Sequence, residues 1–298
     1  MKQISTCPIC DSANSSEFLK AKDYTVSNET FTIVECSDCT FRYTNPIPEE
    51  ENIGEYYKSE DYISHSGTKK GIVPKIYHQV RKITLKRKRN LVNKHSNGKK
   101  VLDIGCGTGD FANFMNTNGF QTTGLEPDED TRNFAINTNN VNAFPIEKLH
   151  QFEEKSFDAI TMWHVLEHVY DLQKDVEQMS KLIKEDGAIY VAVPNCASAD
   201  AEKYGEFWAA YDLPIHLYHF RADDVRNLFG KFGMEVTEVI PMNFDAFWNS
   251  MWSEKYIAGN TGFSLKSMVK GFFSGLSSNR KAGKEGSSSL TYVIKRKK

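Results

Sequence analysis

The sequence predicts an α/β fold, in which helices cover both faces of a parallel sheet, with a small cysteine-bearing module before it. Three observations support this prediction. Apolar runs of strand length alternate with helical patterns from residue 101 onward. A glycine-rich turn follows the first of these runs, and two C-x-x-C pairs lie within residues 1–45. A chain of 298 residues has room for one large domain and one small domain.

The composition is that of a globular protein, with 40% hydrophobic and 26% charged residues. A net charge of −2 names no class of partner. No apolar run reaches the roughly 18 residues of a membrane span, and no apolar leader precedes Cys7, so we expect a cytoplasmic protein. In a reducing compartment, C-x-x-C pairs more often bind metal than form disulfides.

Residues 1–45 are expected to form a zinc-binding module. Its two cysteine pairs offer four thiolates, a complete tetrahedral set that leaves no open coordination position, so the role would be structural. A hairpin through residues 18–34 would join the pairs, and the alternative is a pair of unmetallated C-x-x-C turns. Lysine and arginine are scattered here, so nucleic acid is not expected as a partner. The candidate zinc ligands are Cys7, Cys10, Cys36 and Cys39.

Residues 46–98 are expected to contain a linker followed by a basic helix. The segment 46–74 is rich in proline, glycine, serine and charge. Apolar residues recur at helical spacing from 75 to 96, and the polar positions between them are strongly basic. This face is either simply solvated or attracts an anionic surface or a phosphate-bearing substrate. The large domain would then span 99–298.

Strands and helices alternate through the large domain. Strands are expected at 101–105, 122–126, 142–146, 157–163 and 188–194, and helices at 109–118, 129–138, 171–184 and 222–232. The final strands would be 234–242 and 289–297, separated by an insert at 243–288.

The insert contains an apolar segment and a polar one. Residues 277–289 are rich in serine, glycine and lysine and predict a flexible loop. The segment 263–277 could cap the active site, form a contact between subunits, or lie on a membrane surface as a peripheral contact. The oligomeric state stays open. The apolar side of this segment comprises Phe263, Leu265, Met268, Val269, Phe272, Phe273 and Leu276.

The glycine-rich turn indicates a nucleotide-type ligand. Gly105, Gly107 and Gly109 give the backbone freedom and allow a ligand to approach the main chain closely. Glu126 ends the next strand, where an acidic side chain can accept both hydroxyls of a ribose. Asp110 stands where the dinucleotide fingerprint needs its third glycine, which disfavours a nucleotide-dependent oxidoreductase or epimerase.

The motif "VLDIGCGTGDF" at 101–111 resembles motif I of class I S-adenosylmethionine-dependent methyltransferases. Three later motifs resemble the fourth strand, the fifth strand and the late helix with the sixth strand of the ubiquinone-biosynthesis-like subgroup: "FDAITMWHVLEHV", "LIKEDGAIYVAVPN" and "HLYHFRADDVRNLFGKFGMEV". The cysteine module is similar to that of sugar C-methyltransferases. The resemblance implies a Rossmann-like doubly wound sheet of seven strands with an antiparallel last pair. It also implies that S-adenosylmethionine is the methyl donor for a small-molecule acceptor.

The resemblance also implies roles for individual residues at the cofactor. Asp103 would orient the glycine turn or face the amino-acid end of the cofactor. The glycines, Gly109 included, would pass beneath the methionine and ribose, and Glu126 would bind the ribose. Ile146 and Glu147 would meet the adenine, and Trp163 and His164 would flank the methionine part.

Methylation of a hydroxyl or an acidic carbon needs a base, and histidine suits neutral pH. His216 follows the fifth strand, at the sheet edge where ligands bind in open α/β folds, and is the first candidate. His168 is the second. Sugar C-methyltransferases have a tyrosine three residues before the histidine that corresponds to His216, whereas this chain has Leu213 at that position. The acceptor could be a sugar, a phenol or quinone-like ring, or a lipid intermediate. A catalytically inactive, zinc-bearing binding protein is the alternative from another class.

Overall fold

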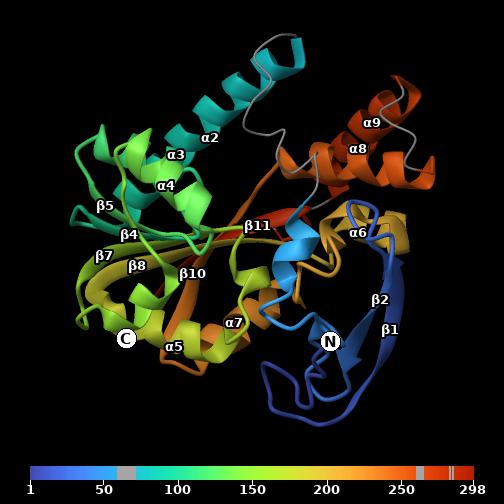
Figure 1. The fold of residues 1–298 in the computed structure, drawn as a ribbon, viewed down its shortest axis with the longest axis horizontal. Helices are drawn as coiled ribbons and strands as arrows, with labels where there is room; N and C mark the ends of the chain where they lie inside the picture. The colour runs from blue at the N-terminus through green and yellow to red at the C-terminus, as the bar shows by residue number, and fades with distance from the viewer. Residues whose placement is uncertain (59–71, 260–264, 282, 284) are drawn as a thin grey trace.

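The computed structural model describes residues 1–58, 72–259, 265–281, 283 and 285–298; the side chains of 72–78, 265, 266 and 281 lie outside this description. Two sheets organise the chain (Figure 1). A seven-stranded sheet forms the centre of the large domain, and a four-stranded sheet carries the cysteine module.

The large sheet has the strand order β10-β11-β8-β7-β4-β5-β6. Its central pairs are parallel, and β11 runs antiparallel to both β8 and β10. This confirms the predicted doubly wound sheet with an antiparallel last pair. The strands are β4 (Lys100–Ile104), β5 (Gln121–Leu125), β6 (Asn142–Phe144), β7 (Phe157–Trp163), β8 (Ile183–Pro194), β10 (Met234–Pro241) and β11 (Ser289–Arg296).

Helices cover both faces of this sheet (Figure 1). On one face lie α2 (Ile72–His95), α3 (Asp110–Asn116) and α4 (Glu129–Asn137), and on the other lie α5 (Leu172–Leu182) and α7 (Ala222–Gly230). Local sequence explains their starts: the Asp128 side chain, for example, accepts a hydrogen bond from the Thr131 amide and caps α4. The short 3-10 helices η3 (Ile146–Gln151) and η4 (Leu166–His168) follow β6 and β7.

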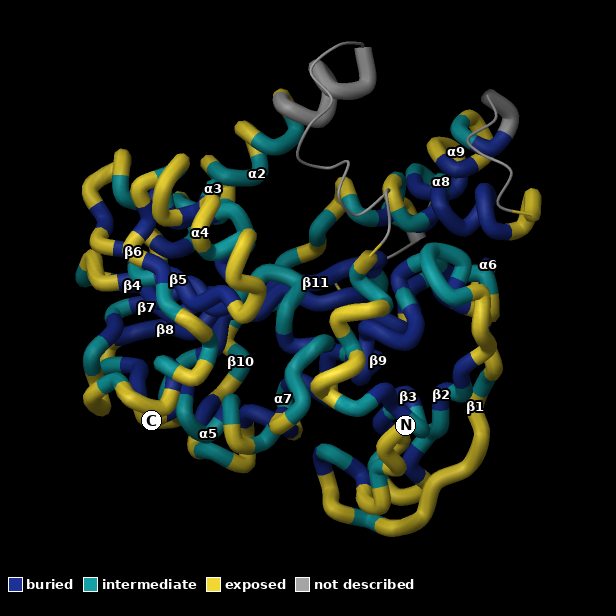
Figure 2. The backbone as a smooth tube through the Cα atoms, in the orientation of Figure 1, coloured by how far each residue is buried: buried dark blue, intermediate teal, exposed yellow. Residues whose placement is uncertain are grey.

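The core lies between the central strands and these helices. Most residues of the central strands are buried (Figure 2). Leu102, Ile160 and Ile189, on three neighbouring strands, are fully buried. Outside the insert, the strands and helices predicted for the large domain agree with the structure to within a few residues, with one larger difference. Strand β8 begins at Ile183, five residues before the predicted start at 188, and takes the end of the predicted helix 171–184.

The cysteine module forms an antiparallel sheet with the order β1-β2-β3-β9. Strands β1 (Ser15–Lys22) and β2 (Thr30–Cys36) form the predicted hairpin, followed by β3 (Arg42–Thr44). The edge strand β9 (Tyr218–His219) comes from the large domain and pairs with β3. The two sheets therefore share a core, in which the rings of Phe41 and Phe220 lie 5.4 Å apart.

The linker and the loop after β8 contain short helices. The part of the linker at 59–71 lies outside the described residues, and η1 (Ile53–Tyr57) precedes it. After β8 come α6 (Ala199–Tyr204), η5 (Gly205–Phe207) and η6 (Ala209–Tyr211). Among the described residues, no helix combines the length and the apolar character that a membrane span requires.

The insert folds into two closely packed helices, α8 (Asp245–Ile257) and α9 (Leu265–Lys281). A Cβ on Gly271 would lie 2.6 Å from the Met251 Cα, so the two helices approach closely where α9 has no side chain. The predicted loop at 277–289 is wrong in its first part, because α9 continues through it to Lys281. Ser278 in this turn donates a hydrogen bond of 2.9 Å to the buried carboxylate of Asp200.

The apolar side predicted for 263–277 is only partly covered. Val269, Phe272 and Phe273 are exposed, whereas Met268 and Leu276 are half-buried. Phe263 lies outside the described residues. The buried side of α9 has small residues instead: Gly271 and Gly275 lie against α8, and Ser274 and Ser278 hydrogen-bond to side chains of α6.

Candidate functional site

The glycine turn follows β4 and has an open side. Gly105, Gly107 and Gly109 have φ angles of +67°, +54° and +80°, in the left-handed region that favours glycine. A Cβ on Gly105 would lie 2.4 Å from a methyl of Val165, so the turn packs tightly there. A Cβ on Gly107 would have no described atom within 4 Å, which leaves room for a ligand against the backbone.

Glu126, at the end of β5, is fixed to this turn. Its Oε2 accepts a hydrogen bond of 2.9 Å from the Gly107 amide, and its Oε1 accepts one of 3.1 Å from the Asp128 amide. Burial raises the pKa of this carboxyl, and the two amides oppose that shift. A carboxylate has about four lone-pair positions, so two remain for a pair of ligand hydroxyls. The geometry fits the predicted role of Glu126 at a ribose.

The buried Asp103, on β4, and the half-buried Lys88 act on each other electrostatically. Asp103 Oδ1 accepts a hydrogen bond of 2.6 Å from the Thr161 hydroxyl, and burial raises its pKa to about 7. Lys88 comes from α2, and burial lowers its pKa to about 8 against the opposing effect of Asp103. Its Nζ lies 4.2 Å from the ring centroid of Trp163. The basic helix thus directs one lysine inward, which the sequence did not single out.

The other predicted cofactor residues lie at the same edge of the sheet. Trp163 ends β7 and packs edge-to-face on Phe111 at 5.5 Å; its Nε1 is buried and has no hydrogen-bond partner among the described residues. Ile146 and Glu147 begin η3 after β6, with Ile146 packed against the core and Glu147 exposed. The structure therefore brings these residues to the carboxyl ends of β7 and β6, on either side of β4 and β5, while their contacts with a cofactor stay predictions.

A cavity of about 370 Å³ lies beyond the ends of β7 and β8. This volume is within the range of small-molecule sites. Helix α8 supplies one wall, with Asp245, Trp248, Asn249, Trp252 and Tyr256, and Thr25 and Tyr56 approach from the N-terminal part. None of the described residues of α9 lines it, so α8 covers this cavity within the described part of the insert.

His164 lines the cavity and is held between two carboxylates. Its φ of +60° is unusual for a residue other than glycine. Its Nδ1 lies 3.4 Å from Glu167 Oε1, and its Nε2 lies 3.2 Å from Asp245 Oδ2. Burial opposes a charge on this ring, but the two carboxylates outweigh it and raise the pKa to about 10. His164 is therefore an imidazolium at neutral pH, and its role beside the methionine part stays a prediction.

His216 and His168, the predicted catalytic residues, are in contact. Their rings meet edge-to-face at 4.6 Å, and His216 lines the cavity. The Nδ1 of His216 lies 2.9 Å from the Ala210 carbonyl oxygen, and that of His168 lies 3.0 Å from the Ile215 carbonyl oxygen. Burial lowers the pKa of both rings, so both are neutral at pH 7. The catalytic role of each stays a prediction.

The cysteine module holds the segment that carries His216. Thr44, at the end of β3, donates a hydroxyl hydrogen bond of 2.7 Å to the His216 carbonyl oxygen and an amide hydrogen bond of 2.9 Å to the Leu217 carbonyl oxygen. On the other side, the Leu217 amide donates to the Glu167 carbonyl oxygen at 2.8 Å. The position of His216 thus depends on β3 and η4 together.

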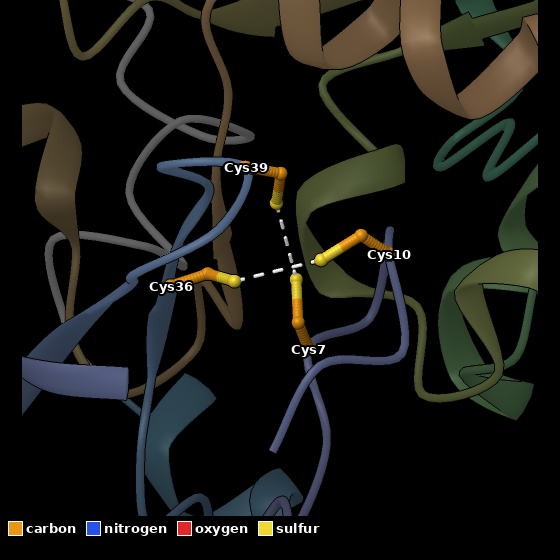
Figure 3. Close-up of side chains that lie close together, drawn as sticks. All are labelled: Cys7, Cys10, Cys36 and Cys39. Atoms are coloured by element: carbon orange, nitrogen blue, oxygen red, sulfur yellow. Dashed lines mark hydrogen bonds between the residues drawn. The ribbon is translucent and has the colours of Figure 1, made fainter. Parts of the chain in front are cut away.

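The four cysteines converge as predicted (Figure 3). Sγ–Sγ distances of 3.5 Å join Cys7 to Cys39 and Cys10 to Cys36, and all four sulfurs lie within 4.8 Å of one another. The sulfurs of a tetrahedral zinc site lie roughly 3.8 Å apart, so the residues present fit this metal. No disulfide joins any of these cysteines. Cys106 and Cys196 are buried elsewhere.

Sequence reasoning missed several charged residues of the site. Asp245 lies in the insert, whose sequence gave no chemical signal. Asp212 lies four residues before His216 and lines the same cavity. Burial, together with the charges of Asp23 and Glu167, raises the pKa of Asp212 to about 7. Its place in "YDLPIH" was the one available hint.

Residues 76–239 match a known family, described as a methyltransferase domain. The chain is 36% identical over 105 residues to the ubiquinone biosynthesis O-methyltransferase of Vibrio atlanticus, covering 33% of this chain and 44% of that protein. The Vibrio cholerae protein of the same name is 30% identical over 164 residues, covering 51% and 65%. The chain thus spans about half to two thirds of the length of these relatives.

Among solved structures, an S-adenosylmethionine-dependent methyltransferase from Archaeoglobus fulgidus is 19% identical, covers 73% of this chain and 94% of its own, and has a TM-score of 0.48. The family match covers more than half of the chain and contains the glycine turn, Glu126 and the cavity histidines. The chain therefore belongs to the methyltransferase domain family.

Proposed function

We propose that the chain transfers a methyl group from S-adenosylmethionine to a small-molecule hydroxyl. The observation that carries the proposal is the Glu126 carboxylate, bound to the Gly107 amide at the open side of the turn. The relatives' name, an O-methyltransferase of ubiquinone biosynthesis, supports an oxygen acceptor. Bound there, the donor supplies a methyl group that its sulfonium already activates.

Each of the predicted cofactor residues would contact a different part of the donor. Glu126 would accept the ribose hydroxyls, and the turn would pass beneath the ribose and methionine. Ile146 and Glu147 would border the adenine, and Asp103 and Trp163 would lie toward the amino-acid end. The chain's task is then to hold the acceptor oxygen in line with the methyl carbon and sulfur, which is a proximity effect.

The acceptor would occupy the cavity behind α8. Trp248, Trp252 and Tyr256 offer aromatic surface for a sugar or phenol ring. In the reaction the acceptor O–H bond breaks, and its proton passes to a group that lines the cavity. The oxygen lone pair forms the bond to the methyl carbon, and the pair of the broken C–S bond stays on sulfur. Asp212, with a pKa of about 7, joins the sequence-predicted His216 as a proton acceptor.

We also propose that Cys7, Cys10, Cys36 and Cys39 bind one structural zinc ion. The fit of their sulfur positions to a tetrahedral site supports this. The ion would stabilise the turns that flank β1 and β2, and through β3 it would hold the segment of His216.

The test is transfer of label from methyl-labelled S-adenosylmethionine to a small-molecule extract. Wild-type protein should move label into the small-molecule fraction, and Glu126→Ala should not at the same donor concentration. Glu129→Ala, at an exposed position on α4, is the matched control and should behave as wild type. Folded wild-type protein that binds the donor but moves no label into any extract would favour the inactive binding protein.

A further inference from the structure

Glu167 is a buried carboxylate with unfilled hydrogen-bonding capacity. It lies in η4, its exposed fraction is 0%, and neither carboxylate oxygen has a hydrogen-bond partner within the described part of the chain. The nearest cationic group is His164, 3.4 Å away, which is shared with Asp245. A buried charge is costly unless it is paired or coordinates a metal, so this carboxylate calls for a ligand.

Two neutral histidines face the same point. One ring nitrogen of His168, one of His216 and one oxygen of Glu167 lie within 4.8 Å of one another. Each histidine has its Nδ1 on a backbone carbonyl oxygen, which can only accept, and the Tyr57 hydroxyl, 2.9 Å from the Nδ1 of His168, can accept as well, so this arrangement fits a proton on Nδ1. This leaves the lone pair on Nε2. Histidines that bind metals show this arrangement, with the other ring N–H donated to a carbonyl or carboxylate.

We propose that Glu167, His168 and His216 bind a divalent metal ion at the wall of the acceptor cavity. Two imidazoles and one carboxylate suit zinc, iron(II) or manganese, and they leave coordination positions open. Ligand atoms on a tetrahedral zinc lie roughly 3.4 Å apart, so side-chain rotations of modest size would close the site from the present 4.8 Å limit. Of the three ligands, His216 lines the cavity and Glu167 and His168 do not, so an acceptor would approach the ion from the side of His216.

The role of this ion rests on the proposed methyl transfer, whereas its binding does not. An ion at this place would bind the acceptor oxygen and lower the pKa of its hydroxyl. The proton would then pass to Asp212, a carboxylate that lines the cavity and is not a ligand. His216 would act as a ligand rather than as the base that the sequence predicts.

The experiment measures metal content and binding in wild-type protein and in Glu167→Gln, His168→Ala and His216→Ala. Manganese(II), zinc(II) and cobalt(II) are supplied separately in equilibrium dialysis, followed by elemental analysis. The cysteines are the same in every variant, so the difference reports on this site alone. We expect each variant to bind one ion fewer than wild type, or to bind it at least about tenfold more weakly. His150→Ala, on η3 outside the site, is the control and should keep the ion.

Thermal melting and donor binding are measured on the same samples. Glu167→Gln preserves side-chain shape, so it keeps the test decisive if a histidine variant fails to fold. Equal metal content in folded wild-type and Glu167→Gln protein would overturn the proposal, even if S-adenosylmethionine binds normally. A metal difference in a chain that does not bind S-adenosylmethionine would support this site and refute the proposed methyl transfer.

Discussion

At the scale of single residues, the site depends on ionisable groups that are buried at the carboxyl ends of strands. Glu126 was predictable, because the residue that ends the second strand of such folds has a fixed relation to the glycine turn. Lys88 and Asp245 were not, because α2 and α8 reach the site only through tertiary packing. Asp212 lies in a left-handed backbone conformation, with φ of +37°, that no local pattern predicts.

Asp212→Asn should remove the pH dependence that titration of this carboxyl gives to the rate of methyl transfer. The carboxyl, with a pKa raised to about 7, is protonated below that pH and can accept a proton only above it. The wild-type rate should therefore rise between about pH 6 and pH 8, and the variant should lose this rise together with about 10²-fold of its rate. The measurement is the rate against pH with the acceptor identified by labelling. An unchanged profile in the folded variant would show that Asp212 does not take the proton.

At the scale of elements, the arrangement of the site depends on contacts between segments that are distant in sequence. Strand β9 completes the sheet of the cysteine module although it follows β8 in the chain. Helix α9 supports α8, which in turn forms a wall of the cavity. The sequence predicted the cysteine hairpin from its spacing, but a two-residue strand such as β9 is too short to show a period.

Cys36→Ser should loosen β9 as well as the module. Losing one thiolate should remove zinc, because metal binding and folding of such a site are coupled. Amide hydrogen exchange should then become faster in β2, β3 and β9, since β9 pairs with β3. Lys20→Ala, at an exposed position of β1, is the control and should exchange as wild type. If Cys36→Ser loses zinc while β9 keeps its protection, the module does not hold this segment.

Gly275→Ala should weaken the packing of α9 on α8. The added Cβ would lie 2.7 Å from the Phe247 Cα, a contact that only a shift of one helix can relieve. We expect a loss of about 1–3 kcal/mol in the free energy of unfolding, measured by denaturant titration. Gly230→Ala is the matched control, because its Cβ would meet no described atom within 4 Å. Equal stability of the two variants would mean that the helices are not in close contact.

At the scale of the whole molecule, the order of motifs along the chain predicted the large sheet well. Each motif combines a strand with the turn after it, and right-handed crossovers leave few ways to assemble such units. The division into a module, a linker and a domain describes the order along the chain. It does not describe separate cores, because one hydrophobic core includes residues of both sheets. The insert was harder to predict. The end of α9 is rich in small residues, a composition typical of a loop, and it forms a helix here by packing against neighbouring elements.

Donor binding by calorimetry tests the central claim most directly. Wild-type protein should bind S-adenosylmethionine and not NAD, because Asp110 stands where the dinucleotide fingerprint needs its third glycine. Glu126→Ala should weaken that binding by about 1–3 kcal/mol through the loss of hydrogen bonds to a charged group, while Glu129→Ala leaves it unchanged. Both variants need melting temperatures close to wild type for the comparison. Binding of NAD, or equal affinity of wild type and Glu126→Ala for S-adenosylmethionine, would contradict the account.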